Sequence, residues 1–438
     1  MNTKRILMAL LCMCIVMVPI FSGGTKESTK SETVNLRMIE SLTSPSRTAL
    51  LQSLIDEFEQ ANPNIKVELI SPPLKEADNK ITQMLMASNN IDIVETREQT
   101  AIQFINNGWI EPMDRYVESW DEYENLSETT KVSITRLGGK AYMIPYGYYQ
   151  RCLYYRADWF EEAGFEAPKS WQELYDIGKA LTDPKKNRYG YSFRGGAGGM
   201  NYADMLYWAY IGDDQIASND AAYFLNDGST IFSHPKAKEA LEFHKALYED
   251  ISPKDSIQWA FAEMVQGFIG GTTAMLIQDP EVIVTCQDNM KEGTWATAPL
   301  PIGPTGESHF PNGYAGWSMT SFSEHKDEAW KLISFLSGSY GNTYFAKNYS
   351  LIPIHATAAD VDPVFREGPF APFLEMDKSP EVFIHTMSPQ QYLAFGSYWS
   401  EADRWYQKYL AGTVTVEEVL QFMDNYWSDA QEKEGVLY

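Results

Sequence analysis

The stretch that decides the fold is GKAYMIPYGYYQRCLYYRADWFEEAGFEAPKSWQELYDIGKALTD, residues 139 to 183. Ala141 to Ile144 has the pattern of a short strand closed by Pro145, and Leu153 to Tyr155 has that of a second strand. Three tyrosines lie on the irregular segment between them, around Gly147. Tyrosine rings are flat and carry a polar hydroxyl group. Three of them at a place where the chain can bend indicate either a rim of core aromatics or a ligand platform at a hinge.

Two helices are predicted after these strands. The first covers Ala157 to Ala163 and ends at Gly164, because glycine readily takes the left-handed conformation that ends helices. The second begins after Ser170, the expected N-cap, and Glu173 three residues later completes a capping box. It is expected to end near Leu181.

Strands and helices alternate in the part of the chain before this stretch. Strands are expected at Val34 to Ile39, Ile65 to Ile70 and Ile91 to Glu95, with helices at Arg47 to Glu59 and Lys80 to Ala87. This order is typical of an α/β domain with a mainly parallel sheet. The later part is more helical, with apolar stripes at Lys236 to Tyr248, Ala260 to Phe268, Asp327 to Ser337, Ser397 to Leu410 and Val416 to Asp429.

The same stretch resembles the extracellular solute-binding proteins of bacterial ABC transporters, specifically the sugar-binding, maltose-binding-protein-like family. Residues 139–145, 160–164 and 170–174 match its G-K-x-Y-x-x-P, F-x-x-A-G and T/S-W-x-E-L patterns. Further segments match in the same order, at 54–67, 92–114, 268–280 and 299–354. The resemblance spans about residues 34 to 425.

The resemblance implies a two-lobed α/β periplasmic-binding-protein fold, with mainly parallel sheets flanked by helices and a ligand cleft between the lobes. The chain would cross between the lobes several times, so each lobe is discontinuous. We expect lobe 1 at 33–146 and 298–350, and lobe 2 at 147–297 and 351–438. The implied role is a monomeric binding subunit that captures a sugar or oligosaccharide and delivers it to membrane permease subunits, with no catalysis and no cofactor.

The resemblance also implies ligand-binding residues at strand ends and in loops. Carried over position by position, they are Glu40, Ser41, Thr96, Arg97, Gln99, Tyr146, Tyr148, Tyr149, Asn201, Tyr202, Asp279, Glu281, Asn312, Gly313, Tyr314, Trp317 and Trp399. Asp279-Pro280-Glu281 departs from the Gly-Pro-Trp that the family often has there. Trp399 lies where the family has a stacking tryptophan.

Composition and motifs exclude some classes of function without reference to the family resemblance. The formal net charge of −24 argues against nucleic acid or an anionic membrane as partner. No H-E-x-x-H, G-x-S-x-G or phosphate-loop motif occurs, whereas the 13% of aromatic residues suits sugar rings, whose apolar faces stack on them. Two alternatives stay open: a secreted glycoside hydrolase, given 59 acidic residues, and a binding protein for a polyamine, a peptide or iron.

The N-terminus has the pattern of an export signal. Lys4 and Arg5 precede the apolar run from Ile6 to Ile20, which is short for a membrane span. We expect a signal peptide over 1–23 and a linker over 24–32, and hence a soluble periplasmic or extracellular protein. The lipid-anchoring cysteine of the family is not found at its expected position, and an uncleaved anchor is the alternative. Cys152 and Cys286, which follow the signal, are expected to be buried free thiols rather than a disulfide.

Overall fold

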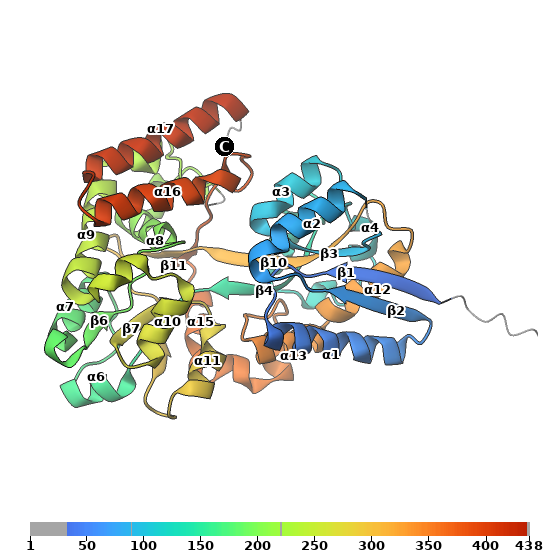
Figure 1. Cartoon of the computed structure of the whole chain (residues 1–438), viewed down its shortest axis with the longest axis horizontal. Coiled ribbons are helices and arrows are strands. Elements are labelled where there is room, and N and C mark those ends of the chain that lie inside the picture. The colour runs from blue at the N-terminus through green and yellow to red at the C-terminus, as the bar shows by residue number, and fades with distance from the viewer. Residues whose placement is uncertain (1–32, 89, 220, 436–438) are drawn as a thin grey trace, which may run out of the picture.

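The computed structural model describes residues 33–88, 90–219 and 221–435. The predicted signal peptide and linker lie outside this part of the chain. Figure 1 shows two lobes next to each other, one containing α2 and α3 and the other containing α16 and α17. Within the described residues, no helix has both the length and the apolar character needed to cross a bilayer. The predicted two-lobed α/β fold is confirmed.

The first lobe is built on a five-stranded sheet in the order β2-β1-β3-β10-β4. Strand β1 pairs parallel with β2 and β3, and β10 pairs antiparallel with β3 and β4. The strands are β1 (Val34–Ile39), β2 (Ile65–Ile70), β3 (Ile93–Arg97), β4 (Ile144–Gln150) and β10 (Asn312–Met319). The helices of this lobe are α1 (Pro45–Ala61), α2 (Ala77–Met86), α3 (Glu98–Asn106), α4 (Asp114–Val117), α5 (Glu128–Thr135), α12 (Lys326–Ser337) and α13 (Ser339–Tyr349).

Strand β4 corrects the prediction that Pro145 closes a strand and that the tyrosines lie on an irregular segment. The strand begins at Ile144 and runs through Pro145 to Gln150. Pro145 is tolerated because it faces Gly316 where the register of β10 shifts, so the ladder does not need its missing N–H group. A Cβ at Gly316 would overlap the carbonyl oxygen of Ile144, so only glycine fits there. The strand also continues past residue 146, the predicted end of the first segment of lobe 1.

The second lobe contains a four-stranded sheet in the order β6-β7-β5-β8. Its strands are β5 (Cys152–Tyr155), β6 (Tyr189–Tyr191), β7 (Thr273–Gln278) and β8 (Ala296–Ala298). Only β6 and β7 pair in parallel here, and β5 is antiparallel to both of its neighbours. The expected mainly parallel pairing therefore needs correcting: both sheets are mixed, because strands that follow a crossing between the lobes return in the opposite direction. A short ladder of β9 (Ser308–Phe310) and β11 (Phe383–His385) stands apart.

Helices cover the second sheet and complete the chain. They are α6 (Ala157–Ala163), α7 (Trp171–Leu181), α8 (Met200–Ile211), α9 (Pro235–Ile251), α10 (Phe261–Ile269), α11 (Val282–Asn289), α14 (Ala358–Val361), α15 (Ala371–Asp377), α16 (Phe395–Leu410) and α17 (Val416–Glu434). Helix α6 has the predicted bounds and ends at Gly164 with φ of 75°. The Ser170 hydroxyl accepts from the Glu173 amide at 3.2 Å, while the Glu173 carboxylate accepts from Lys169 N rather than from the N-cap.

Both cysteines of the described chain are buried free thiols, as expected. Cys152 begins β5, directly after the first crossing between the lobes, and Cys286 lies on α11. Burial raises the pKa of the Cys286 thiol to about 12 and raises that of Cys152 as well. Neither thiol is poised for chemistry, because the reactive thiolate is suppressed.

Candidate ligand cleft between the lobes

A cavity of about 270 Å³ lies between the two lobes. Its wall includes eight of the residues predicted to bind ligand: Arg97, Gln99, Tyr149, Asn201, Asp279, Glu281, Gly313 and Tyr314. Six further residues of the wall were not among those expected from the family resemblance: Leu42, Glu98, Arg151, Pro311, Ala315 and Tyr349. The wall thus combines the β3–α3 junction of the first lobe, the β7–α11 junction of the second, and the crossing strands β4 and β10.

On the side of the first lobe, Glu98 is the main acidic group. It is the first residue of α3, and its carboxylate accepts from the Tyr314 amide at 3.1 Å. Burial raises the pKa of Glu98 to about 7. The neighbouring Arg97 forms an ion pair with Asp78, so its guanidinium is already engaged. Glu98 could have been predicted as a site residue from the sequence, because it lies between two predicted site residues, Arg97 and Gln99.

On the side of the second lobe, two carboxylates follow the end of β7. Asp279 lies near Arg151, with 3.7 Å between Oδ1 and Nε. Arg151 is held by the carbonyl of Asn201, to which Nη1 donates at 3.2 Å, and by the ring of Tyr202 at 4.1 Å. Burial raises the pKa of Asp279, and burial together with the charge of Asp279 raises the pKa of Glu281 to about 7. Tyr202 therefore acts behind Arg151 and not in the wall itself.

Tyrosine rings complete the wall. Tyr349, the last residue of α13, donates from its hydroxyl to Glu281 at 3.3 Å. This bond connects the first lobe to the second. Tyr149 lies beside it on β4, and its hydroxyl is 3.3 Å from that of Tyr146. Tyr314 lies on β10, which crosses to the same region.

Several predicted residues lie in the interior of the first lobe and not in the cavity wall. The Glu40 carboxylate, with an exposed fraction of 0%, binds Arg47 and accepts from the Thr48 hydroxyl at 2.5 Å. The Ser41 amide donates to Glu95 at 2.5 Å. Thr96 is likewise buried, on β3. Glu40 and Ser41 follow the end of β1, as ligand residues often do, but Glu40 binds α1 and all three side chains are buried.

The crossing aromatics divide between the core and the cavity. The Tyr146 hydroxyl donates to Glu95 at 2.5 Å, and its ring packs on Trp317 with 5.0 Å between centroids. The Tyr148 hydroxyl donates to Thr130 at 3.0 Å. Tyr146, Tyr148 and Trp317 are thus core aromatics, whereas Tyr149 lines the cavity. The interpretation as core aromatics therefore holds for Tyr146 and Tyr148, and the ligand platform stays a prediction for Tyr149.

Two further predicted residues, Trp399 and Asn312, lie outside the wall of the cavity. Trp399 is half-buried on α16 and packs edge-on against Phe395 and Tyr398, at 6.0 and 5.5 Å, outside the wall of the cavity. Helix α16 nevertheless lies close to α3 of the other lobe. Asn312 begins β10, where its backbone is paired with that of Gln150.

The glycine-rich loop at residues 195–199 does not form a phosphate cradle. Its amide donors are used internally, since the Asp403 carboxylate accepts from Gly198 N at 2.6 Å and from Met200 N at 3.1 Å. A carboxylate in that position repels an anionic ligand. The loop instead leads into α8 and fixes Asn201, which lines the cavity.

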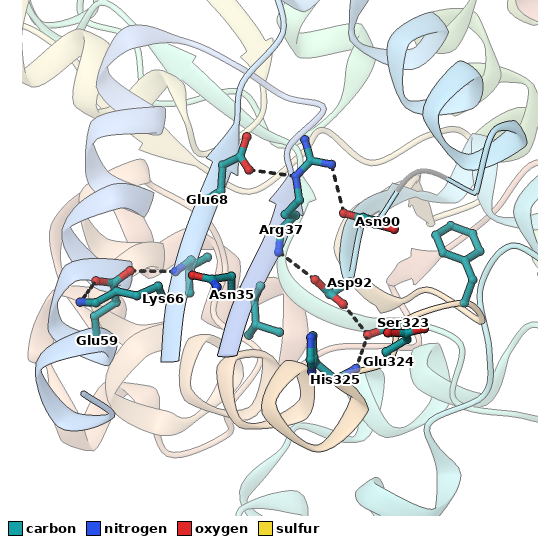
Figure 2. A pocket seen from close by; sticks show the side chains of 13 residues that line it. Asn35, Arg37, Glu59, Lys66, Glu68, Asn90, Asp92, Ser323, Glu324 and His325 are labelled. Atoms are coloured by element: carbon teal, nitrogen blue, oxygen red, sulfur yellow. Dashed lines mark hydrogen bonds and ion pairs between the residues drawn. The ribbon is translucent and has the colours of Figure 1, made fainter. Parts of the chain in front are cut away.

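A larger hollow, of about 820 Å³, lies on the first lobe alone, and Figure 2 shows its side chains. Its charged groups pair with one another: Arg37 with Glu68 at 2.9 Å and Lys66 with Glu59 at 2.6 Å. Asp92 accepts from the Ser323 hydroxyl at 2.5 Å. Since these groups satisfy each other, the cavity between the lobes is the better candidate for a ligand. Among the described residues, no three histidine, cysteine, aspartate or glutamate side chains are placed to hold a metal ion.

Comparison with known proteins decides the family. Residues 44–341 match the model of the bacterial extracellular solute-binding protein family. The chain belongs to this family. This solute-binding protein is 27% identical over 307 residues to a protein of Brucella abortus described as a binding protein, covering 70% of this chain and 72% of that one. It is 23% identical to a mannitol-binding protein of Pseudomonas aeruginosa, over 61% of this chain and 58% of the relative.

Solved structures show the same fold. Maltose-bound MalE3 of T. maritima superposes on this solute-binding protein with a TM-score of 0.76 at 21% identity, covering 91% of this chain and 99% of that one. An ABC substrate-binding protein of Listeria monocytogenes in complex with cycloalternan gives a TM-score of 0.75 at 19% identity, covering 93% and 100%. The chain is therefore a solute-binding protein that shares the fold of these structures.

Proposed function

We propose that this solute-binding protein captures a sugar or short oligosaccharide in the cleft and delivers it, chemically unchanged, to the permease of an ABC importer. One observation carries the proposal: both lobes contribute to a single cavity that combines tyrosine rings, carboxylates and a guanidinium. Sugar rings stack on aromatic faces, and their hydroxyls bond to planar polar side chains. The named ligands of similar proteins, mannitol and maltose, support the same class.

The size of the cavity favours a small ligand. Its volume of about 270 Å³ lies at the lower end of small-molecule sites, which span ~300–1,000 Å³. A ligand of one or two sugar rings suits this space better than a long chain. We therefore expect mono- and disaccharides or polyols to bind more tightly than long oligosaccharides.

Capture would work by closure of the lobes. A ligand that touches Glu98 on one lobe and Asp279 on the other gains contacts only when the lobes are closed, so it shifts the population toward that state. The bond from Tyr349 to Glu281 already joins the lobes at the rim of the cavity. We propose that it forms on closure and breaks on opening.

We also propose that the protein acts without catalysis, as an exported monomer in the periplasm or outside the cell, with permease subunits and not nucleic acid as its partners. The charge of −24 and the basic, apolar N-terminus support this part. Secreted protein should begin near residues 22 to 25 on N-terminal sequencing and should sediment as a monomer. A first residue of Met1 with detergent partitioning would contradict export as a soluble protein.

Calorimetric titration with a panel of mono- and disaccharides and polyols tests the main proposal. At least one should bind, raise the melting temperature by mass action, and shrink the radius of gyration in solution scattering. The recovered ligand should be unchanged. A glycoside hydrolase would need two carboxylates ~5–9.5 Å apart around the bond, and Glu98, Asp279 and Glu281 are the carboxylates that line the cavity. Cleaved sugar released by the wild-type protein, and lost in Glu281→Gln, would replace the proposed function with that alternative.

A further inference from the structure

The charges that face the cleft do not balance. Three carboxylates line it: Glu98, Asp279 and Glu281. Of the two guanidinium groups in the wall, that of Arg97 is paired with Asp78 outside the cavity, and that of Arg151 lies beside Asp279. In the described part of the chain, neither Glu98 nor Glu281 has a lysine or arginine nitrogen within ion-pair distance. One carboxylate on each lobe therefore lacks a countercharge.

The surroundings of these two carboxylates do not make up for the missing charge. Arg47 and Arg194 act on Glu281 only at longer range, Asp279 repels it, and Tyr349 gives it a single hydroxyl bond. The Arg47 guanidinium is occupied by Glu40 and Glu95.

Glu98 is in a comparable position. The Tyr314 amide and the Gln390 side chain hydrogen-bond to its carboxylate, and the charges of Arg136 and Arg97 favour its ionised form. Burial raises the pKa of Glu98 and that of Glu281 to about 7, as expected when the charged form loses water and gains hydrogen bonds but no adjacent cation. A cation brought by the ligand would reverse this penalty at both positions.

A second, independent observation points to a ligand oxygen in the same cavity. The Arg151 side chain is 8% exposed, and its Nε has no hydrogen-bond partner within the described residues. The 3.7 Å gap between Nε and Asp279 leaves this donor free for a ligand hydroxyl, which could in turn donate to the carboxylate. Such a pair of partners recognises a hydroxyl and not an ammonium group.

The required ligand therefore has three properties: a ring for the tyrosines, hydroxyls for Arg151 and Asp279, and a positive charge for Glu98 and Glu281. A linear polyamine has the charge but neither the ring nor the hydroxyl. A neutral sugar has the ring, and its hydroxyls can donate to the carboxylates, but it brings no countercharge for them. A bare metal ion needs donors grouped around one point, and the described residues bring no such group together.

We infer that the cleft takes an amino sugar, whose protonated amine pairs with the carboxylates of Glu98 and Glu281 while its hydroxyls bond to Arg151 and Asp279. The inference rests on the proposed function, since it specifies the kind of saccharide that the same cleft binds. The amine contacts one carboxylate from each lobe, so its charge also favours the closed state.

Matched sugars test this inference. The full chain is titrated by calorimetry near neutral pH with glucosamine, galactosamine and mannosamine, and with the N-acetyl and parent hydroxyl form of each. At least one amino sugar should bind about 10- to 100-fold more tightly than both of its neutral partners, as expected for a bond between charged groups in a desolvated site. A neutral partner that binds as tightly as its amine, across every sugar that binds, would overturn the inference while leaving the proposed function intact.

Substitutions in the cleft test which carboxylates produce the preference for the amino sugar. Glu281→Gln keeps the size and the bond from Tyr349 but removes the charge, so it should lower the ratio of the affinity for the amine to that for the neutral sugar to about one. Glu98→Gln should act in the same direction. Glu292→Gln, an exposed position on the same lobe, is the matched control and should retain the full preference. An undiminished preference in both cleft variants would contradict the assignment of these carboxylates.

The remaining outcomes separate the two proposals. Spermidine that binds while none of the sugars does would overturn the sugar proposal and would make the cleft a polyamine site. Calcium that competes with the amino sugar would replace the organic cation with a metal ion. Failure of every sugar, amine and ion to bind a chain with a cooperative melting transition would count against both proposals.

Discussion

Two clusters of acidic groups and arginine, one in the core of the first lobe and one in the cleft, have similar composition and opposite pairing. In the core, Arg47 binds both Glu40 and Glu95, and all three side chains have an exposed fraction of 0%. In the cleft, Arg151 lies near Asp279 only at 3.7 Å, and Glu281 has no cation beside it. The core cluster forms both of its ion pairs without a ligand, although Arg47 Nε has no hydrogen-bond partner among the described residues, whereas the cleft cluster leaves Glu281 without an adjacent cation.

This difference shows how to distinguish a buried charged group that stabilises the fold from one that binds a ligand. Rings of Tyr146, Phe345 and Tyr349 surround the Arg47 guanidinium at 5.3 to 5.5 Å, which leaves no room for a further partner. A buried charge whose countercharge lies within the protein stabilises the fold, whereas a buried charge without an adjacent countercharge can be paired by a ligand. The predictions below challenge this distinction.

The largest effect is expected from Arg47→Met. The change leaves Glu40 and Glu95 buried without a countercharge, which should cost about 3–5 kcal/mol of unfolding free energy. Urea unfolding followed by circular dichroism measures it. Arg151→Met in the cleft, where the pairing is looser, is the comparison and should cost less than half as much. Equal losses in the two variants would remove the distinction between the clusters.

Tyr149→Ala should weaken sugar binding by roughly 2–4 kcal/mol, because a desolvated aromatic anchor is lost from the wall of the cavity. Trp399→Ala is the matched comparison. The resemblance gives Trp399 a stacking role, but its ring packs on Phe395 and Tyr398 outside the wall. Calorimetric titration of both variants with the same sugar should rank Tyr149 first. The reverse ranking would show that α16 closes onto the ligand.

Glu281→Gln should change how stability depends on pH. The folded-state pKa of Glu281, about 7, lies above its ordinary value of 4.5, so the folded state binds the proton more tightly than the unfolded state. The wild type should therefore lose about 3 kcal/mol relative to the variant as pH rises from about 4.5 to about 8, and the difference should stay constant above that. Thermal unfolding without ligand across this range measures it. Parallel curves for the two proteins would mean that Glu281 is already paired.

The smallest effect is expected from Tyr349→Phe. The variant removes only the hydroxyl that donates to Glu281 across the lobes, a bond contributing about 0.5–1.5 kcal/mol. Solution scattering without ligand should show a larger mean radius of gyration, because the closed population falls. An unchanged radius together with unchanged sugar affinity would show that this bond does not contribute to closure.

Much of the fold could be predicted because its signals are local. Gly164 ends α6 and Thr415 caps α17 through bonds within a few residues. Both bounds of α6 and the start of α17 were predicted, whereas α17 continues past its predicted end at Asp429 to Glu434. Strand β4 was mispredicted for the opposite reason. The rule that Pro145 ends a strand is local, and the bulge at Gly316 that relaxes it lies on a strand far along the chain.

The cleft was predictable only in part, and for a similar reason. Residues at strand ends were placed correctly in the chain, but sequence does not show which way a side chain points. Glu40 therefore turns inward to Arg47, while Asp279 turns toward the cavity. Tyr349 was missed because it ends a helix with no distinctive motif. Arg151 directly follows the crossing tyrosines, and its position there was a usable signal.

The two buried cysteines make this chain convenient for optical reporting of its ligand. Maleimide dyes react with thiolates, and burial raises the pKa of both Cys152 and Cys286 so that neither supplies one at neutral pH. A cysteine introduced at an exposed position on each lobe could thus be labelled without first replacing the native ones. The distance between two such dyes would report lobe closure in real time, one molecule at a time.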